Sequence, residues 1–260
     1  MGPDRTTLRK RLAARAPIFG AWTSIGSAQI TEMFTASTVD FVGIDLEHST
    51  ISQEQSQRII AAAQAAGVAC LPRVASHNGE QVKRLLDSGA DGVIVPMVST
   101  VAEVEAIVSW TKYTPAGKRS FGIARAQDYG DRFDDYITRW NQRSVIIIQI
   151  ESVQGADNAE ALLSHPEIDG VMIGPYDLSG SLGVPGQLEH PSVTAAVQRV
   201  IDVTRRLGKA CGTQLVEPTV AGIDAAYAAG HSFIVLASDV FILAAWSRRM
   251  RDVVQTVRSR

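Results

Sequence analysis

Short apolar runs alternate along the chain with longer segments of helical spacing. Eight runs are rich in β-branched residues and apolar on both faces, which is typical of buried parallel strands. They cover Phe19–Thr23, Phe41–Asp45, Ala69–Arg73, Gly92–Val95, Val145–Ile150, Gly170–Ile173, Ala210–Thr213 and Phe233–Leu236. The helical segments are Ala28–Ser37, Gln53–Ala66, Gly79–Ser88, Val101–Trp110, Gly155–Leu163, Ser192–Leu207, Val220–Ala229 and one from Asp239 towards the C-terminus. The pattern predicts a strand–helix unit that repeats through the chain.

The number of these units indicates how the sheet is arranged. Eight strands and eight helices in 260 residues favour a closed (β/α)8 TIM barrel, with a six-stranded open sheet plus extra elements as the alternative. No linker rich in Pro, Gly or Ser divides the chain, so residues 1–260 are predicted to form one domain. Leu8, Leu12 and Ala13 have the spacing of a short amphipathic helix that closes the domain at its N-terminus.

Two segments are longer than ordinary connections in such a fold. They are Thr114–Tyr136 and Tyr176–Pro191, and both contain several Gly and Pro residues. Long loops in a compact domain are usually functional or mobile, and in a barrel they matter for function if they follow a strand, at its C-terminal face.

Composition narrows the class of protein. A hydrophobic content of 45% and a formal charge of −2 argue against long-range disorder and against general affinity for nucleic acid or anionic membranes. No apolar run approaches the roughly 18 residues that a bilayer span needs, and the first 20 residues lack the apolar core of a secretory signal. Cys70 and Cys211 each lie in an apolar run, which indicates buried thiols. We expect a cytoplasmic protein with no nucleic-acid or membrane partner.

Polar side chains collect where the predicted strands end. They are Asp45, Glu47, His48, Arg73, Gln149, Glu151 and Asp177. Active sites of (β/α)8 barrels lie at the carboxyl ends of the strands, so these residues are the candidates for chemistry. Strand alternation puts Gln149 and Glu151 on the same face of the sheet, on either side of Ile150.

Glu151 and Asp177 follow adjacent predicted strands and carry like charges. Two converging carboxylates repel each other unless one is protonated or a cation lies between them. Carboxylate oxygens suit Mg²⁺ or Mn²⁺, which would leave the other coordination positions to water or substrate. The alternative is a pair of solvated carboxylates at helix N-termini, where the helix dipole favours negative charge.

Asp45, His48 and Arg73 are the remaining ionisable candidates. A carboxylate within hydrogen-bond reach of an imidazole fixes its tautomer, which would make His48 a general base oriented by Asp45. The alternative is a capping Asp followed by a polar loop His. Arg73 suits a substrate carboxylate or an enolate oxygen. Its alternative is a structural ion pair with Asp45, Glu47 or Asp87.

Six segments of the chain together resemble the HpcH/HpaI aldolase/citrate lyase family, over nearly its whole length and in family order. They read FVGIDLEHSTIS, LPRV, VKRLLDSGADGVIVPMV, RSFGIARAQDYG, IIQIES and DGVMIGPYDLSGSLG. The succession of IDxEH, QIE and GPxDLS is specific to the family. Typical members are metal-dependent class II pyruvate aldolases such as the 4-hydroxy-2-oxoheptanedioate aldolases.

The resemblance implies a role for each candidate residue. It implies that Glu151 and Asp177 bind a divalent metal such as Mg²⁺, Mn²⁺ or Co²⁺, and that His48, oriented by Asp45, transfers protons. It implies that Arg73 contacts the 2-oxo acid and stabilises its enolate. The remaining substrate-binding residues it implies are Gln149, Gly174, Pro175 and Tyr176.

The resemblance also implies an assembly: a hexamer built as a trimer of dimers, with the C-terminal helix exchanged between subunits and Asp87 near a subunit boundary. The chain departs from the family pattern at two places. Tyr176 stands where related aldolases often carry a small residue, and Ser76-His77-Asn78 replaces a more usual Trp-Asn-Asp-like sequence. Both departures are expected to affect the substrate pocket rather than the metal ligands.

The predicted function is therefore a divalent-metal-dependent lyase. It would make or break the bond between a pyruvate-like 2-oxo acid and an aldehyde, through an enolate that the metal stabilises. Claisen-type condensation or lysis, as in citrate lyases and synthases, and oxaloacetate decarboxylation are alternatives at the same site. A non-catalytic metabolite-binding barrel is the alternative from another class, and the presence of both carboxylates and the histidine disfavours it.

Overall fold

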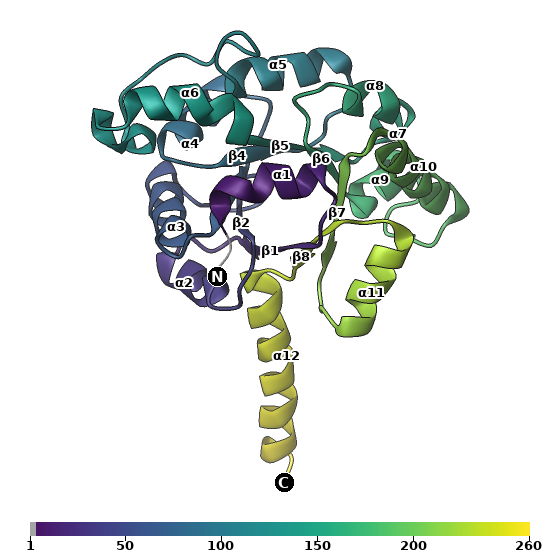
Figure 1. The fold of residues 1–260 in the computed structure, drawn as a ribbon. Helices are drawn as coiled ribbons and strands as arrows, with labels where there is room; N and C mark the ends of the chain where they lie inside the picture. The colour runs from purple at the N-terminus through teal and green to yellow at the C-terminus, as the bar shows by residue number, and fades with distance from the viewer. Residues whose placement is uncertain (1–3) are drawn as a thin grey trace.

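A computed structural model describes residues 4–260, in which eight parallel strands close into a barrel surrounded by helices (Figure 1). The strands are β1 (Ile18–Thr23), β2 (Phe41–Asp45), β3 (Ala69–Arg73), β4 (Gly92–Val95), β5 (Val145–Ile150), β6 (Gly170–Ile173), β7 (Ala210–Leu215) and β8 (Phe233–Leu236). Each strand pairs with its neighbours in sequence, and β8 pairs with β1. The closed barrel confirms the predicted (β/α)8 fold and excludes the open sheet.

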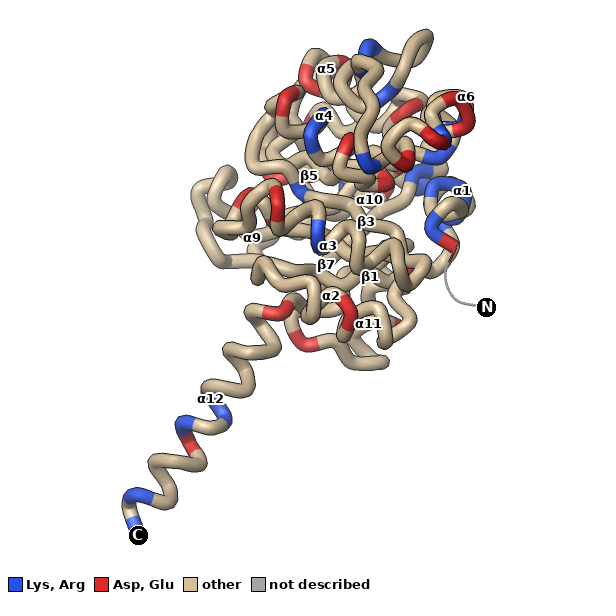
Figure 2. Tube along the Cα trace, turned by 90° about the vertical axis from the view of Figure 1, so that its left-hand side faces the viewer, with Lys and Arg blue, Asp and Glu red and all other residues tan. Residues whose placement is uncertain are grey.

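The helices follow the strands in the order that the pattern predicts, with additions. They are η1 (Arg5–Thr7), α1 (Leu8–Ala13), α2 (Ala28–Thr35), α3 (Gln53–Ala65), α4 (Gly79–Asp87), α5 (Val101–Thr111), η2 (Arg125–Gly130), α6 (Phe133–Arg143), α7 (Val153–Asp157), α8 (Ala159–Leu163), α9 (Pro175–Ser181), α10 (Pro191–Leu207), α11 (Val220–Ala229) and α12 (Asp239–Arg258). The short helix α1 confirms the expected amphipathic segment, with Leu8 and Leu12 buried. Helix α12 projects away from the barrel (Figures 1 and 2).

Three helical segments differ from the predictions. The expected loop Thr114–Tyr136 contains η2 and the first turn of α6, and the expected loop Tyr176–Pro191 contains most of α9. The single helix predicted over Gly155–Leu163 is two helices, because Asn158 leaves the helical conformation between α7 and α8. Its side-chain amide donates to the carbonyl oxygen of Ser99 at 2.8 Å. This hydrogen bond fixes Asn158 against the segment between β4 and α5.

The barrel interior is filled by large apolar side chains that glycines make room for. Phe41, Phe233 and Trp22 are all buried there. A Cβ atom at Gly43 would overlap the Trp22 ring, so this glycine is required for the indole to lie across the barrel. Trp22 in turn lies against the guanidinium of Arg73, 5.1 Å from the ring centre. The core therefore supports the polar residues at the strand ends.

The N-terminal end of the barrel carries a device that repeats at every second strand. Asp40, Asp91, Asp169 and Ser232 each directly precede an even-numbered strand. Each side chain accepts a backbone N–H of the preceding odd-numbered strand, from Phe19, Cys70, Ile146 and Cys211 at distances of 2.8, 3.0, 2.8 and 3.1 Å respectively. These bonds join the strands in pairs at the N-terminal end.

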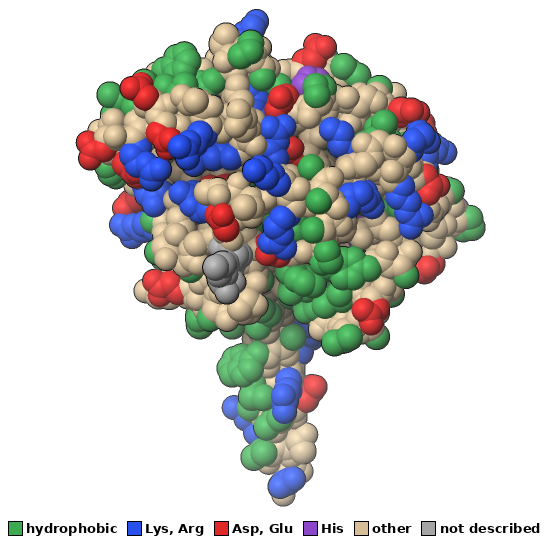
Figure 3. All heavy atoms as spheres, in the orientation of Figure 1, with side chains coloured by type: hydrophobic (Ala, Val, Ile, Leu, Met, Phe, Trp, Pro, Cys, Tyr) green, Lys and Arg blue, Asp and Glu red, His purple; other side chains and the backbone are tan. Residues whose placement is uncertain are grey.

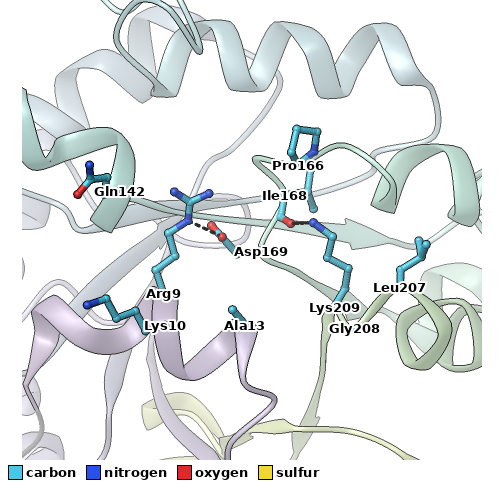
Figure 4. A pocket seen from close by; sticks show the side chains of 10 residues that line it. All are labelled: Arg9, Lys10, Ala13, Gln142, Pro166, Ile168, Asp169, Leu207, Gly208 and Lys209. Atoms are coloured by element: carbon cyan, nitrogen blue, oxygen red, sulfur yellow. Dashed lines mark hydrogen bonds and ion pairs between the residues drawn. The ribbon is translucent and has the colours of Figure 1, made fainter.

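Arginines of the N-terminal segment bind the three aspartates, and a fourth arginine binds the backbone near Ser232. Arg11 pairs with Asp40, Arg5 with Asp91 at 2.6 Å, and Arg9 with Asp169 at 2.7 Å (Figure 4). At the fourth position Arg15 donates to the carbonyl oxygens of Lys209 and Gly230. Helix α1 lies across this end of the barrel, and basic side chains gather over it (Figure 3). We call Arg5, Arg9, Arg11 and Arg15 the arginine clamp.

Both cysteines are free and buried, as the sequence predicts. Among residues 4–260, no helix is long and apolar enough to cross a membrane.

Candidate active site

Arg73, the last residue of β3, contacts three of the predicted site residues at the carboxyl end of the barrel. Its Nη2 and Nε donate to Oδ1 of Asp45 at 2.8 and 3.2 Å. Its Nη1 lies 3.0 Å from Oε2 of Glu47 and 3.5 Å from Oε1 of Gln149. The structural ion pair with Asp45 and Glu47 is therefore present, whereas Asp87 pairs instead with Arg119 at 2.8 Å.

Asp45 and His48 are arranged differently from the expected dyad. Asp45 Oδ1 accepts the backbone N–H of Glu47 at 3.2 Å and of His48 at 3.0 Å, so the spacing of three residues forms a local turn. The His48 side chain is 66% exposed, and its Nε2 lies 3.7 Å from Glu47 Oε2. In the described chain the imidazole forms no hydrogen bond to Asp45, because the turn uses that carboxylate for backbone amides and Arg73.

The charge state of Asp45 follows from these contacts. Burial alone would raise its pKa, but the guanidinium of Arg73 and the hydrogen bond from the His48 backbone hold that pKa below its usual value. Asp45 is thus an ionised, fully engaged residue that anchors Arg73.

Glu151 lies just past β5 and is the most deeply buried carboxylate of the cluster, with 4% of the residue exposed. Its Oε1 accepts from Nε2 of Gln149 at 3.1 Å, which confirms that the two share a face. Its Oε2 accepts the backbone N–H of Met97 at 2.9 Å, and Met97 has a left-handed φ of 55°. Burial raises the pKa of Glu151 to about 7, although the Met97 bond opposes the rise; the charges of Glu47 and Asp177 raise it further.

The segment after β6 contains four more predicted residues, and two of them, Gly174 and Asp177, lie near Glu151. A Cβ at Gly174 would overlap Oε1 of Glu151, so glycine is required for this close approach. Pro175 is the first residue of α9, where its missing N–H costs nothing. Asp177 in the first turn of α9 is close enough for its charge to raise the pKa of Glu151. Tyr176 is 68% exposed at the mouth.

Two residues of the cluster had no catalytic, substrate-binding or metal-binding role assigned to them from the sequence. Glu47 has a buried Oε2 that pairs with the charge of Arg73 but forms no hydrogen bond, and burial raises the pKa of its carboxyl despite that arginine. Its signal was present in the strand-end sequence Asp45-Leu46-Glu47-His48. Trp22 under Arg73 gave no such signal, because an aromatic residue at the end of an apolar run is typical of the core.

The donor set fits a divalent cation. Glu151 and Asp177 supply carboxylate oxygens, the ligands that Mg²⁺ and Mn²⁺ prefer. Burial raises the pKa of Glu151 although the charge of Arg73 opposes the rise, and a bound cation would remove this cost of burying the carboxylate. No group of three or more His, Cys, Asp or Glu side chains within residues 4–260 is arranged to hold a metal, so a cation here would rely on few protein ligands.

His77 contacts the neighbouring strand end. Its Nε2 lies 2.7 Å from the carbonyl oxygen of Pro96, and Asn78 rather than His77 caps α4 through bonds to Glu80 and Gln81. His77 thus borders the connection that positions Met97 and Glu151.

Comparisons with known proteins agree with this geometry. Residues 19–245 match the sequence profile of the family described as HpcH/HpaI aldolase/citrate lyase. The chain is 34% identical to a hydroxypyruvate/pyruvate aldolase of Paraburkholderia phytofirmans over 97% of each chain. The structure resembles that of a family protein from Burkholderia cenocepacia, with a TM-score of 0.88, 30% identity and coverage of 97% and 99%. It also resembles a citrate synthase, with a TM-score of 0.83, 29% identity and 97% of each chain covered.

Matches of this length and identity settle the relationship that the sequence motifs indicated. The relatives include named aldolases, so the predicted type of enzyme, a carbon–carbon lyase of class II, is confirmed as well. The chain therefore belongs to the HpcH/HpaI aldolase/citrate lyase family.

Proposed function

We propose that this enzyme makes or cleaves the bond between a pyruvate-like 2-oxo acid and an aldehyde, with a divalent cation held by Glu151 and Asp177. The observation that carries the proposal is the buried Glu151 carboxylate, whose pKa is raised to about 7 beside Glu47, Asp177 and a single arginine. A site built in this way favours a cation.

The residues of the chain have distinct proposed roles. Arg73, held by Asp45 and Glu47, would face the negative charge that develops on the keto oxygen, with Gln149 beside it. His48 is exposed at the mouth and would carry the proton to and from the hydroxyl of the aldehyde-derived carbon. Gly174, Pro175 and Tyr176 would border the substrate carboxylate.

The cation, as Mg²⁺, Mn²⁺ or Co²⁺, would supply Lewis-acid stabilisation of negative charge on the 2-oxo acid. Glu151 would have to be deprotonated to hold it, which links the affinity for the cation to the pKa of this carboxyl.

Resemblance to a citrate synthase favours a second candidate reaction, a Claisen-type condensation or lysis at the same site. The two are separated by substrate: pyruvate with aldehydes for the aldol reaction, and an acyl thioester with a 2-oxo acid for the Claisen reaction. Turnover of the thioester alone would make the second candidate the function.

We further propose that the enzyme works in the cytoplasm as a homo-oligomer, a hexamer formed as a trimer of dimers. The exposed apolar side chains of α12 support association, and the two free buried thiols suit a reducing compartment.

Chelation tests the proposed function. EDTA treatment should abolish cleavage activity without unfolding the protein, and Mg²⁺, Mn²⁺ or Co²⁺ should restore it. Glu151→Gln and Asp177→Asn should each prevent restoration, whereas Glu160→Gln, which changes an exposed carboxylate on α8, should behave as wild type. In the restored enzyme, His48→Ala should lower kcat by about 10²–10⁴-fold. Full activity at a metal content near zero would contradict the proposal.

A further inference from the structure

A polar cavity lies away from the barrel mouth, between α3, η2 and α6. Its volume is about 370 Å³, within the range of small-molecule sites. Three guanidinium groups line it, those of Arg5, Arg125 and Arg143, against the single carboxylate of Asp128. The cavity is therefore positively charged and shares no lining residue with the active site.

Arg125 is positioned by uncharged partners. Its Nη1 donates to Oε1 of Gln64 at 2.8 Å and to the carbonyl oxygen of Ser88 at 3.0 Å. A Cβ at Gly89 would overlap this nitrogen, and Gly89 has a φ of 106°, so glycine is needed to seat the guanidinium. Within residues 4–260, Arg125 forms no ion pair, which leaves its charge and its other nitrogens available to a ligand.

Arg143, at the end of α6, is held by aromatic stacking. Its guanidinium carbon lies 5.0 Å from the ring centre of Tyr136 and 5.9 Å from that of Trp140. Its Nε is buried without a hydrogen-bond partner, and no carboxylate of the described chain pairs with it. A buried donor without a partner destabilises the fold, and an anionic acceptor would offset that loss.

The other two charges do not neutralise this pair. Arg5 is engaged with Asp91 at 2.6 Å as part of the arginine clamp. Asp128 is exposed, and its nearest cation is Arg132 at 3.8 Å. Two guanidiniums, one fixed by hydrogen bonds and one by stacking, thus face the same cavity without a protein counter-charge.

We propose that this cavity is a binding site for a small metabolite carrying a doubly charged oxyanion, either a phosphate ester or a dicarboxylate. Planar guanidinium forks match the oxygen pairs of both groups. Because Arg125 and Arg143 are already held in place, little side-chain entropy is lost on binding. The site is independent of the proposed reaction, since none of its residues lies at the strand ends.

Calorimetric titration of the full-length protein with inorganic phosphate, and separately with malonate, tests the proposal. Saturating pyruvate with Mg²⁺ keeps both anions from the active site, and no polycarboxylate chelator is present to compete for the cavity. We expect saturable binding of at least one anion, and the preferred one identifies the ligand class. Absence of saturable binding of either anion up to about 20 mM, well above a dissociation constant of about 1 mM, would overturn the proposal.

Matched variants locate the binding. Arg143→Gln and Arg125→Lys should each weaken it about 10-fold or more, because the first removes a charge and the second removes the fork. Arg139→Gln removes an exposed, paired arginine from the same helix and should bind as wild type. Equal binding by all three variants would place the anion elsewhere and overturn the proposal.

Tungstate soaked into crystals of the wild-type protein gives a test that does not depend on variant stability. Anomalous density between Arg125 and Arg143 supports the site, and density confined to other positions contradicts it.

Discussion

Arg73 connects three strand ends of the barrel through one side chain. Its contacts reach Asp45 at the end of β2, Glu47 just after it and Gln149 on β5, and its face lies against Trp22 of β1. The structure therefore contains the ion pair that was the alternative to a substrate contact, and one guanidinium could serve both purposes. A substrate oxygen would compete with the carboxylates of Asp45 and Glu47 for the N–H groups of Arg73. Whether Arg73 binds substrate as well as these carboxylates therefore depends on its planar, forked guanidinium.

Arg73→Lys separates the two roles. Lysine keeps the charge and the pairing with Asp45 but loses the planar fork. We expect kcat/KM to fall about 10- to 100-fold, which corresponds to the about 1.5–3 kcal/mol of a hydrogen bond to a charged group. Exchange of pyruvate protons with deuterated solvent should slow in parallel, while the unfolding midpoint changes little. Unchanged proton exchange would leave Arg73 with the structural role alone.

Glu151 makes the stability of the metal-free protein depend on pH. Its pKa in the folded state is about 7, above the ordinary value of 4.5, so the folded state holds the proton more tightly than the unfolded chain. The stability contributed by the protonated form is complete below pH 4.5 and is lost as the pH rises towards 7. The shift corresponds to about 3 kcal/mol.

Glu151→Gln should remove this dependence, because the amide does not titrate. Urea unfolding in EDTA is expected to show the variant gaining about 3 kcal/mol over wild type between pH 5 and pH 8. A saturating divalent cation should abolish the difference at pH 8. Parallel stability profiles for the two proteins would contradict the raised pKa.

Residue types at the site were predictable from sequence, but their partners were not. The end of a parallel strand identifies Asp45, Arg73, Gln149 and Glu151 as neighbours, because the fold brings those ends together. The direction in which a side chain points depends on which nearby donors and acceptors compete for it. Backbone amides and Arg73 take the Asp45 carboxylate, so the imidazole of His48 lies elsewhere.

At the scale of elements, the strands were predictable and two helices were not. In a barrel, a run that is apolar on both faces clearly indicates a strand. Every predicted strand is present, with ends within two residues of those predicted. Helix α6 is amphipathic but polar overall, with only Tyr136 and Trp140 buried, and it follows a segment rich in Gly and charged residues that indicates a loop. Helix α9 begins at a proline and contains Gly180, which also indicates a loop.

The arginine clamp is an element-level device that ties α1 to the barrel. Arg9 pairs with Asp169 at 2.7 Å and with Glu167 at 2.8 Å, and Asp169 also bonds the backbone of β5. Burial raises the pKa of Asp169, even though Arg9 and Lys112 lower it. Removing the arginine therefore leaves a buried carboxylate with incomplete compensation.

Arg9→Gln should destabilise the protein by about 3 kcal/mol in urea unfolding at pH 7, since removal of one partner of a buried pair typically costs about 3–5 kcal/mol. Lys10→Gln changes the adjacent exposed residue and should stay within about 0.5 kcal/mol of wild type. Adding Asp169→Asn to Arg9→Gln should recover part of the loss. Equal stability of the Arg9 and Lys10 variants would refute the clamp.

At the scale of the whole molecule, α12 is the one described element that extends beyond the barrel. This helix of 20 residues extends beyond the barrel (Figure 2), and its apolar side chains recur at helical spacing along one stripe. The stripe comprises Ile242, Leu243, Trp246, Met250, Val253, Val254 and Val257. An isolated helix of this length is marginal in water, and Trp246 is 61% exposed. The stripe therefore requires a cover from outside the chain, which the proposed exchange between subunits would supply.

Replacing apolar residues of the stripe tests whether it holds the assembly together. Leu243→Glu with Trp246→Glu puts two charges where apolar contact is required, so burial of either residue against a second copy becomes unfavourable by several kcal/mol. We expect light scattering after gel filtration to show a hexamer for wild type and a smaller species for the double variant, at protein concentrations of about 10 µM. Gln255→Glu adds a charge on the opposite face of α12 and should leave the assembly intact.

Because the barrel core contains no residue of the stripe, circular dichroism should show both variants folded. An unchanged mass for the double variant would mean that α12 is not the element that joins the subunits.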